Sequence, residues 1–145
     1  MPKIDEQIVI SFPKEAVFKQ ITSTDFMKAI DPNFGHNTTV LFENERLMRS
    51  ISKVEGIGDV EIERITIPEA FAIITQRRQP LPPFIYQLSI QILFDHNEET
   101  LLKWTNEFEL DPNNQHREAA IVSILRRNDA MNLKNMEKQL KDCLP

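Results

Sequence analysis

The sequence HREAAIVSILRRNDAMNLKNMEKQL, residues 116–140, is the longest helical pattern in this chain, and the other elements are arranged around it. Its apolar side chains recur at steps of three and four residues, which places them on one face of an α-helix. About 25 residues at roughly 1.5 Å each give a helix of about 37 Å, long enough to cross a small domain. The sequence therefore predicts a long C-terminal helix that must be covered along one face. That face consists of Val122, Leu125, Asp129, Leu133, Met136 and Leu140, widened by Ile121, Ile124 and Met131.

Asp129 interrupts this apolar face with a carboxylate. A carboxylate removed from water is costly unless it is paired or hydrogen-bonded. The sequence leaves two interpretations open. Asp129 is either an exposed or internally paired group at the edge of the face, or a polar group that faces a cavity.

Seven strand-like segments and two short helices precede the long helix. The strand-like segments are rich in β-branched and aromatic residues and alternate with a period of two. We expect Pro13 to begin the first short helix with Ser11 as its cap, and Asn113 or Asn114 to cap the long helix. The second short helix, over residues 25–30, should end at Asp31-Pro32. The predicted strands cover residues 3–12, 39–45, 47–54, 60–67, 71–78, 84–95 and 101–110.

The last two strands form the clearest hairpin, joined by residues 96–99. In each strand, one parity is mostly apolar and the other mostly polar, a pattern typical of an antiparallel sheet that is covered on one side. We therefore predict that the apolar parity of both strands faces the long helix. That inner face would hold Phe84, Tyr86, Leu88, Ile90, Ile92 and Phe94 from one strand, and Leu102, Trp104, Asn106, Phe108 and Leu110 from the other.

The order of these elements resembles the START-like helix-grip superfamily, also called SRPBCC, which includes polyketide cyclases and lipid-transfer domains. The local marks are Pro13-x-x-x-Val17-Phe18, Gly58 at a strand start, Pro68-Glu69-x-Phe71 and the turn at residues 99–104. A departure is that Phe26 and Phe34 stand where many members have a tryptophan. The resemblance implies an α+β fold in which a curved seven-stranded antiparallel sheet grips the C-terminal helix over a hydrophobic cavity. Because the superfamily has no shared catalytic set, the resemblance implies no single activity.

Composition bounds the function further. A chain of 145 residues suits a single domain over residues 1–145. The net charge of −5 argues against a nucleic-acid partner, which requires a basic surface. No apolar run approaches the roughly 20 residues needed to insert across a bilayer. The charged start and the single cysteine, Cys143, favour a cytoplasmic protein.

No catalytic triad, cofactor motif or metal site is recognisable in the sequence. His36, His96 and His116 fall in predicted turns or helix-capping segments, and their spacing does not match a metal site. Gly56-Ile57-Gly58 lacks the lysine and the following helix of a phosphate loop, so we interpret it as a strand-to-strand turn. We expect no cofactor and no metal.

Three arginines fall on the apolar parity of predicted strands: Arg49, Arg64 and Arg77. A buried guanidinium needs an acceptor. They either reach water or a carboxylate such as Asp129, or they receive the acidic end of a hydrophobic ligand, to which the planar guanidinium is suited.

These patterns favour the binding of a hydrophobic small molecule, lipid- or polyketide-like with an acidic end. A polyketide cyclase or dehydratase is the alternative, with Tyr86, Asn106 or an arginine as acid or oxyanion partner. A protein-interaction domain like the Hsp90-activator branch is the third. The last hairpin and the Pro80–Pro83 loop are candidate homodimer contacts. The candidate ligand-binding residues are Arg49, Arg64, Phe71, Ile73, Arg77, Tyr86, Leu88, Trp104, Asn106 and Asp129.

Overall fold

The computed structural model describes residues 2–30, 37–54, 58–77 and 83–144. Its strands form one antiparallel sheet in the order β1-β7-β6-β5-β4-β3-β2. Two short helices follow the first strand and a long helix ends the chain, as the sequence predicts. The elements are β1 Lys3–Ile10, α1 Lys14–Ile21, α2 Thr24–Ile30, β2 Thr38–Glu43, β3 Leu47–Val54, β4 Gly58–Ile67, β5 Ala72–Arg77, β6 Phe84–His96, β7 Glu99–Leu110 and α4 Glu118–Cys143.

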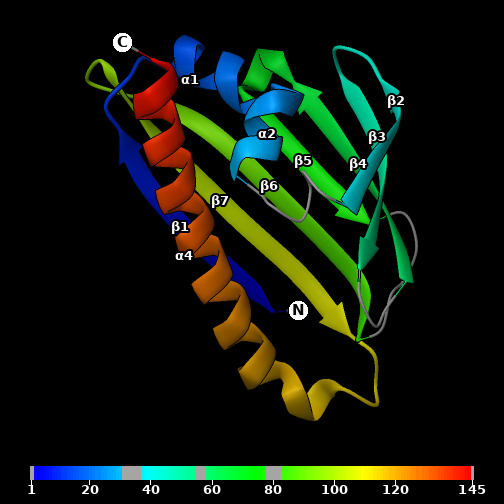
Figure 1. Cartoon of the computed structure of the whole chain (residues 1–145). Helices are drawn as coiled ribbons and strands as arrows, with labels where there is room; N and C mark the ends of the chain where they lie inside the picture. The colour runs from blue at the N-terminus through cyan, green and yellow to red at the C-terminus, as the bar shows by residue number, and fades with distance from the viewer. Residues whose placement is uncertain (1, 31–36, 55–57, 78–82, 145) are drawn as a thin grey trace.

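All three of these helices lie on one side of a curved sheet (Figure 1). The long helix α4 runs beside β1, α1 packs on β6 and β7, and α2 lies between α1 and α4 on the same side of the sheet. No helix in the described ranges is long and apolar enough to cross a membrane. The predicted α+β arrangement, a sheet gripping its terminal helix, is confirmed.

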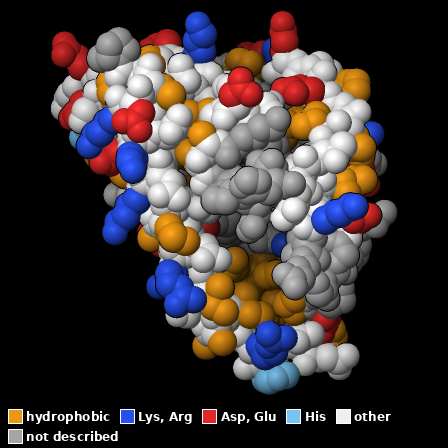
Figure 2. Space-filling model, in the orientation of Figure 1, with side chains coloured by type: hydrophobic (Ala, Val, Ile, Leu, Met, Phe, Trp, Pro, Cys, Tyr) orange, Lys and Arg blue, Asp and Glu red, His pale blue; other side chains and the backbone are white. Residues whose placement is uncertain are grey.

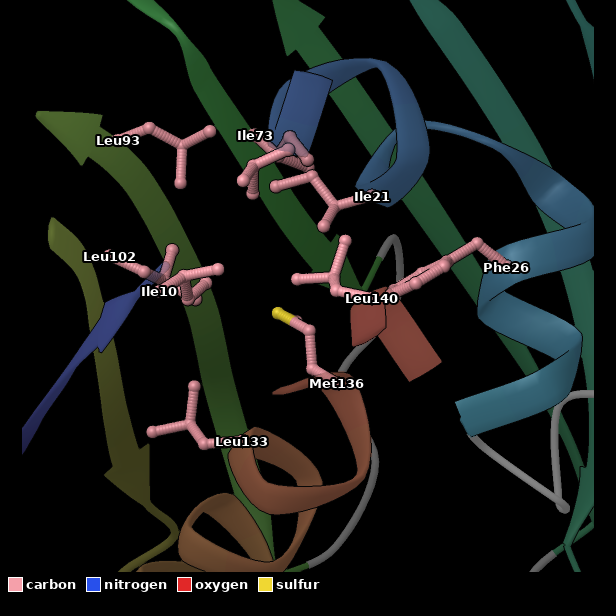
Figure 3. Packing of buried hydrophobic residues seen from close by; sticks show 10 residues of the cluster. Ile10, Ile21, Phe26, Ile73, Leu93, Leu102, Leu133, Met136 and Leu140 are labelled. Atoms are coloured by element: carbon pink, nitrogen blue, oxygen red, sulfur yellow. The ribbon is translucent and has the colours of Figure 1, made fainter. Parts of the chain in front are cut away.

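The apolar face of α4 packs where the sequence places it. Ile121, Leu133, Met136 and Leu140 are buried, whereas Ile124 and Met131 are 47% and 53% exposed, so those two do not widen the face. Figure 3 shows Met136 and Leu140 between Ile10 of β1 and Phe26 of α2, within one apolar cluster. A second cluster, toward the start of α4, joins Ile121 to Ile4, Phe108 and Leu110. Burial of these side chains holds the helix on the sheet.

Several predicted helix starts and turn boundaries are wrong by a few residues, and the predicted helix caps are wrong. Pro13 precedes α1 with extended backbone, φ −63° and ψ 148°, and no side chain caps that helix, so Ser11 is not its cap. A 3-10 turn, Gln115–Arg117, separates Asn114 from α4, so neither Asn113 nor Asn114 caps the long helix. The last hairpin turns through two residues alone, Asn97 and Glu98, whose positive φ values of 49° and 69° suit a tight hairpin.

Some predictions fall on residues that the structure does not describe. These concern the helix end at Asp31-Pro32, His36 and the aromatic Phe34. They also include the Gly56-Ile57-Gly58 turn, of which Gly58 alone is described as the start of β4, and most of the Pro80–Pro83 loop.

The predicted orientation of β6 is wrong. A bulge between Phe84 and Tyr86 shifts the register, so Phe84 pairs with Leu110 and Tyr86 pairs with Glu109. Because a one-residue shift moves every following side chain to the other face, the bulge turns the apolar parity outward. Tyr86, Leu88, Ile90, Ile92 and Phe94 lie on the convex face, and Gln87, Ser89, Gln91 and Leu93 face the helices.

The predicted orientation of β7 is confirmed. Leu102 and Phe108 are fully buried, and Asn106 is 6% exposed on the concave side. Trp104 shares this inner face with them, whereas Tyr86 does not.

Candidate functional site

A cavity of about 270 Å³ lies between the concave face of the sheet and the helices α2 and α4. Figure 2, which views the molecule in the orientation of Figure 1, shows hydrophobic side chains gathered in a hollow beside the lower half of α4. The helices contribute apolar groups to the cavity, chiefly Phe26, Ile30, Leu125 and Met136. The sheet contributes mainly polar groups, Thr75, Gln87, Ser89, Gln91 and Asn106. The cavity therefore has an apolar wall formed by the helices and a wall of hydrogen-bonding groups formed by the sheet.

The polar wall follows from the orientation of β6. Alternate residues of a strand point to the same face at steps of about 6.7 Å, so Gln87, Ser89 and Gln91 form an evenly spaced row. Trp104 of the neighbouring strand donates from Nε1 to Ser89 Oγ at 2.6 Å. That bond fixes the indole ring against the row and leaves the Ser89 hydroxyl hydrogen free for another acceptor.

Asp129 of α4 lies in the cavity and is 6% exposed. Asn106 of β7 donates from Nδ2 to Asp129 Oδ2. Burial raises the pKa of the Asp129 carboxyl to about 6, the hydrogen bond from Asn106 opposes the rise, and the charge of Glu6 adds to it. The interpretation of Asp129 as a polar group facing a cavity is confirmed, and the carboxyl also has an internal partner.

Arg64 of β4 also lines the cavity and is 5% exposed. Its Nη2 donates to the Thr22 carbonyl at 2.9 Å and its Nη1 contacts the sulfur of Met27, while its buried Nε has no partner. Burial lowers the pKa of Arg64, and the charge of Glu43 acts against this. The guanidinium thus ties the corner between α1 and α2 to the sheet, where the negative end of the α1 dipole favours a cation.

Arg77 lies inward on β5, opposite Ile62, and lines a side pocket of about 160 Å³. Its guanidinium carbon is 5.2 Å from the centre of the Phe84 ring. Burial lowers the pKa of Arg77. Ile73 of the same strand lines the main cavity, as predicted.

Four predicted ligand-binding residues line neither the main cavity nor the side pocket of Arg77. Tyr86 and Leu88 lie on the convex face because of the β6 bulge. Arg49 also points to that face, where its Nε is 3.4 Å from Glu63 Oε2, because its parity on β3 is the outward one. Phe71 ends a 3-10 turn with φ 49° and packs edge-on against Phe18 of α1, 5.3 Å between ring centres.

Five residues that line the cavity were not among the predicted ligand-binding residues: Thr75, Gln87, Ser89, Gln91 and Asn132. A signal for Asn132 existed, because it follows Asp129 by three residues on one helix face. The row was visible as a polar parity, but the usual rule assigns such a parity to solvent. No group of three or more metal-ligating side chains gathers within the residues that the structure describes.

Comparison with known proteins finds neither a matching family model nor a matching curated protein sequence. Solved structures do match. The Zhui aromatase/cyclase from Streptomyces sp. R1128 aligns with a TM-score of 0.80 and 13% identity over 99% of this chain and 96% of that one. Norcoclaurine synthase from Thalictrum flavum gives 0.74 and 10% over 96% and 86%. A START superfamily protein from Mycobacterium smegmatis gives 0.73 and 12% over 97% and 98%.

Likenesses at this level of identity establish architecture and no activity. They agree with the sheet order and the single-sided helices described above. The resemblance drawn from the sequence is confirmed for the architecture: the chain has the START-like helix-grip fold.

Proposed function

We propose that this protein binds a small hydrophobic molecule that carries several carbonyl or hydroxyl groups along one edge. The observation that carries the proposal is the inward row Gln87, Ser89 and Gln91, which faces apolar side chains of α2 and α4. Polar groups that line a cavity need hydrogen-bonding partners, and a purely aliphatic lipid would leave them unmatched. A polyketide-like ligand would suit both walls, because its apolar body would pack on the helices and its carbonyl or hydroxyl groups would bond to the polar row.

The size of the cavity supports a compact ligand. About 270 Å³ lies just below the usual range of ligand pockets, roughly 300–1,000 Å³, so a two-ring molecule suits it better than a long chain. Burial of the apolar side of the ligand would supply the driving force, about 25 cal/mol for each Å² removed from water. The polar row would then select which edge of the ligand faces the sheet.

Trp104 provides the test, because it lines the cavity and is the single tryptophan of the chain. We expect 2-naphthol, a two-ring probe with one hydroxyl, to quench its fluorescence in a saturable manner. Gln91→Leu should weaken binding about threefold to tenfold, the effect of one lost hydrogen bond. Gln7→Leu, the same change on the outer face of β1, should leave binding unchanged. Absence of saturable binding, confirmed by calorimetry, would contradict the proposal.

An enzyme of the cyclase or dehydratase kind is the second candidate, and Asp129 favours it. A carboxyl in a cavity with a pKa raised to about 6 can both accept and donate a proton near neutral pH. Asn106 orients it through its hydrogen bond. Cyclisation of a ketone begins with loss of a proton from the carbon beside the carbonyl, and the Asp129 carboxylate would take that proton.

Exchange of the methyl protons of 2-acetylnaphthalene in D₂O, followed by NMR, tests this chemistry. The wild-type protein should accelerate exchange over buffer, and Asp129→Asn should abolish the acceleration while it preserves binding of the ketone. Equal exchange by both proteins would remove Asp129 from any catalytic role. The protein-interaction hypothesis has weaker support, because a cavity with one polar wall lies between the sheet and the helices, where a filled core would be expected.

A further inference from the structure

The side pocket of about 160 Å³ adjoins the main cavity. Thr75, Gln87 and Ser89 line both, so the two hollows share one wall. A ligand that occupies the main cavity would reach the side pocket across these residues. The side pocket is therefore suited to a substituent of the ligand and too small for a separate molecule of similar size.

Arg77 gives the side pocket its charge. Arginine stays protonated at all ordinary pH values, even where burial lowers its pKa, so the side pocket contains a cation. Its guanidinium lies over the Phe84 ring, and no ion pair of Arg77 is found among the described residues. A partly buried cation without a carboxylate is a costly arrangement that an anion would relieve.

The neighbouring groups can all donate hydrogen bonds. Ser89 Oγ accepts the bond from Trp104, which leaves its hydroxyl hydrogen free. Thr75 brings a second hydroxyl, and Gln87 brings an amide whose oxygen is buried without a partner, so no described neighbour fixes that amide. Three donors beside one guanidinium match a group that has acceptor oxygens alone.

We infer that the side pocket receives the carboxylate of a ligand whose apolar body lies in the main cavity. The inference rests on the proposed binding function and adds the chemical class of the ligand, an aromatic or polycyclic carboxylic acid. One guanidinium balances one negative charge, whereas a phosphate dianion would keep an uncompensated charge in a partly buried site.

Arg77 carries this role because the other two arginines are engaged. The Nη2 of Arg64 donates to the Thr22 carbonyl and holds the corner of α1 and α2. Arg49 pairs with Glu63 on the opposite face of the sheet. The guanidinium of Arg77 is left to bind a carboxylate.

A matched pair of probes tests the assignment: 2-naphthoic acid and its neutral amide, 2-naphthamide, each titrated near neutral pH by Trp104 fluorescence and calorimetry. The wild-type protein should bind the acid at least about tenfold more tightly than the amide. Arg77→Met should abolish this preference and change amide affinity less than about twofold. Arg49→Met, the same substitution on the outer face, should preserve the preference.

The outcomes separate the two proposals. If the wild-type protein binds the acid and the amide equally tightly, the side pocket does not receive a carboxylate, while the proposal of ligand binding in the main cavity stands. Failure of both probes to bind overturns the proposed function instead. A preference that survives in Arg77→Met, or that Arg64→Met abolishes, also overturns the assignment.

Thr75→Val provides a second variant, independent of whether Arg77→Met folds by circular dichroism. It removes one donor at nearly constant volume and should reduce the acid preference about threefold. An unchanged preference in this variant would contradict the donor set proposed for the pocket.

Discussion

Strands β6 and β7 are the two arms of one hairpin, yet the side chains that they place on the concave face are mostly polar in β6 and mostly apolar in β7. Facing the helices, β7 has Leu102 and Phe108, both fully buried. On the same face, β6 has Gln87, Ser89 and Gln91, which meet a cavity. The two strands thus differ in emphasis: Leu102 and Phe108 of β7 pack in the core while its Trp104 and Asn106 line the cavity, and most inward side chains of β6 form the polar wall of that cavity. A conflict between the pattern of a strand and its place in the fold is expected at functional sites, which supports the proposal that the cavity binds a ligand.

Truncation of one leucine on each strand should give the largest effect. Leu102→Ala in β7 removes a fully buried side chain and should reduce the free energy of unfolding by about 3 kcal/mol. Leu88→Ala in β6, the same change on the convex face, should cost about 1 kcal/mol or less, because its neighbours leave that side chain partly in water. Urea denaturation measures both. Similar losses in the two variants would contradict the assigned orientation of β6.

Asp129 should make the stability of the protein depend on pH. Its pKa in the folded protein is about 6, above the ordinary value of 3.8, so the folded state holds this proton more tightly than the unfolded state does. The protonated Asp129 carboxyl therefore stabilises the folded state. This stabilisation is present in full below about pH 4 and is lost as the pH rises to about 6. Near neutral pH the buried charge should cost about 1–3 kcal/mol.

Asp129→Asn isolates this contribution, since it removes the charge and keeps the shape. The difference in unfolding free energy between variant and wild type should shift in favour of the variant between about pH 4 and pH 6. A difference that stays constant across this window would show that the Asp129 carboxyl titrates normally. The hydrogen bond from Asn106 would then offset the effect of burial on the pKa of this carboxyl.

The long helix and the inner face of β7 could be predicted from the sequence because both depend on a local period. Leu133, Met136 and Leu140 recur at helical steps, and burial of that face was confirmed. Trp104 and Asn106 alternate with the polar residues Lys103, Thr105 and Glu107 along β7, so their parity also indicated their face. Local period determines which residues share a face, and here the default of apolar side inward held.

The orientation of β6 could not be predicted by the same rule. From Tyr86 onward, the alternation correctly separated the apolar residues of β6 from its polar residues. A bulge between Phe84 and Tyr86 reversed the faces, so the polar residues point inward toward the cavity. Phe71 was misplaced because a positive φ redirects its side chain toward Phe18. The wall formed by Phe26 of α2 depends on where that helix docks, which is a tertiary property and leaves no local pattern.

The smallest effect should come from Arg49, which lies across the sheet from the cavity. Its ion pair with Glu63 joins a side chain that is 40% exposed to one that is 15% exposed. Such a pair is screened by solvent, and Glu63 keeps a second partner in Gln76, whose Nε2 lies 3.2 Å from its Oε1. Arg49→Met should therefore change the free energy of unfolding by less than about 0.5 kcal/mol in urea.

The same variant tests whether the two faces of the sheet act independently. If function belongs to the concave face alone, Arg49→Met must leave the fluorescence titrations with 2-naphthol and 2-naphthoic acid unchanged. A loss of affinity in this variant would mean that the convex face communicates with the cavity through β3 and β4, where Arg49 and Arg64 are cross-strand neighbours of Glu63 and Met48. The proposal that binding belongs to the concave face alone requires that Arg49→Met has no such effect.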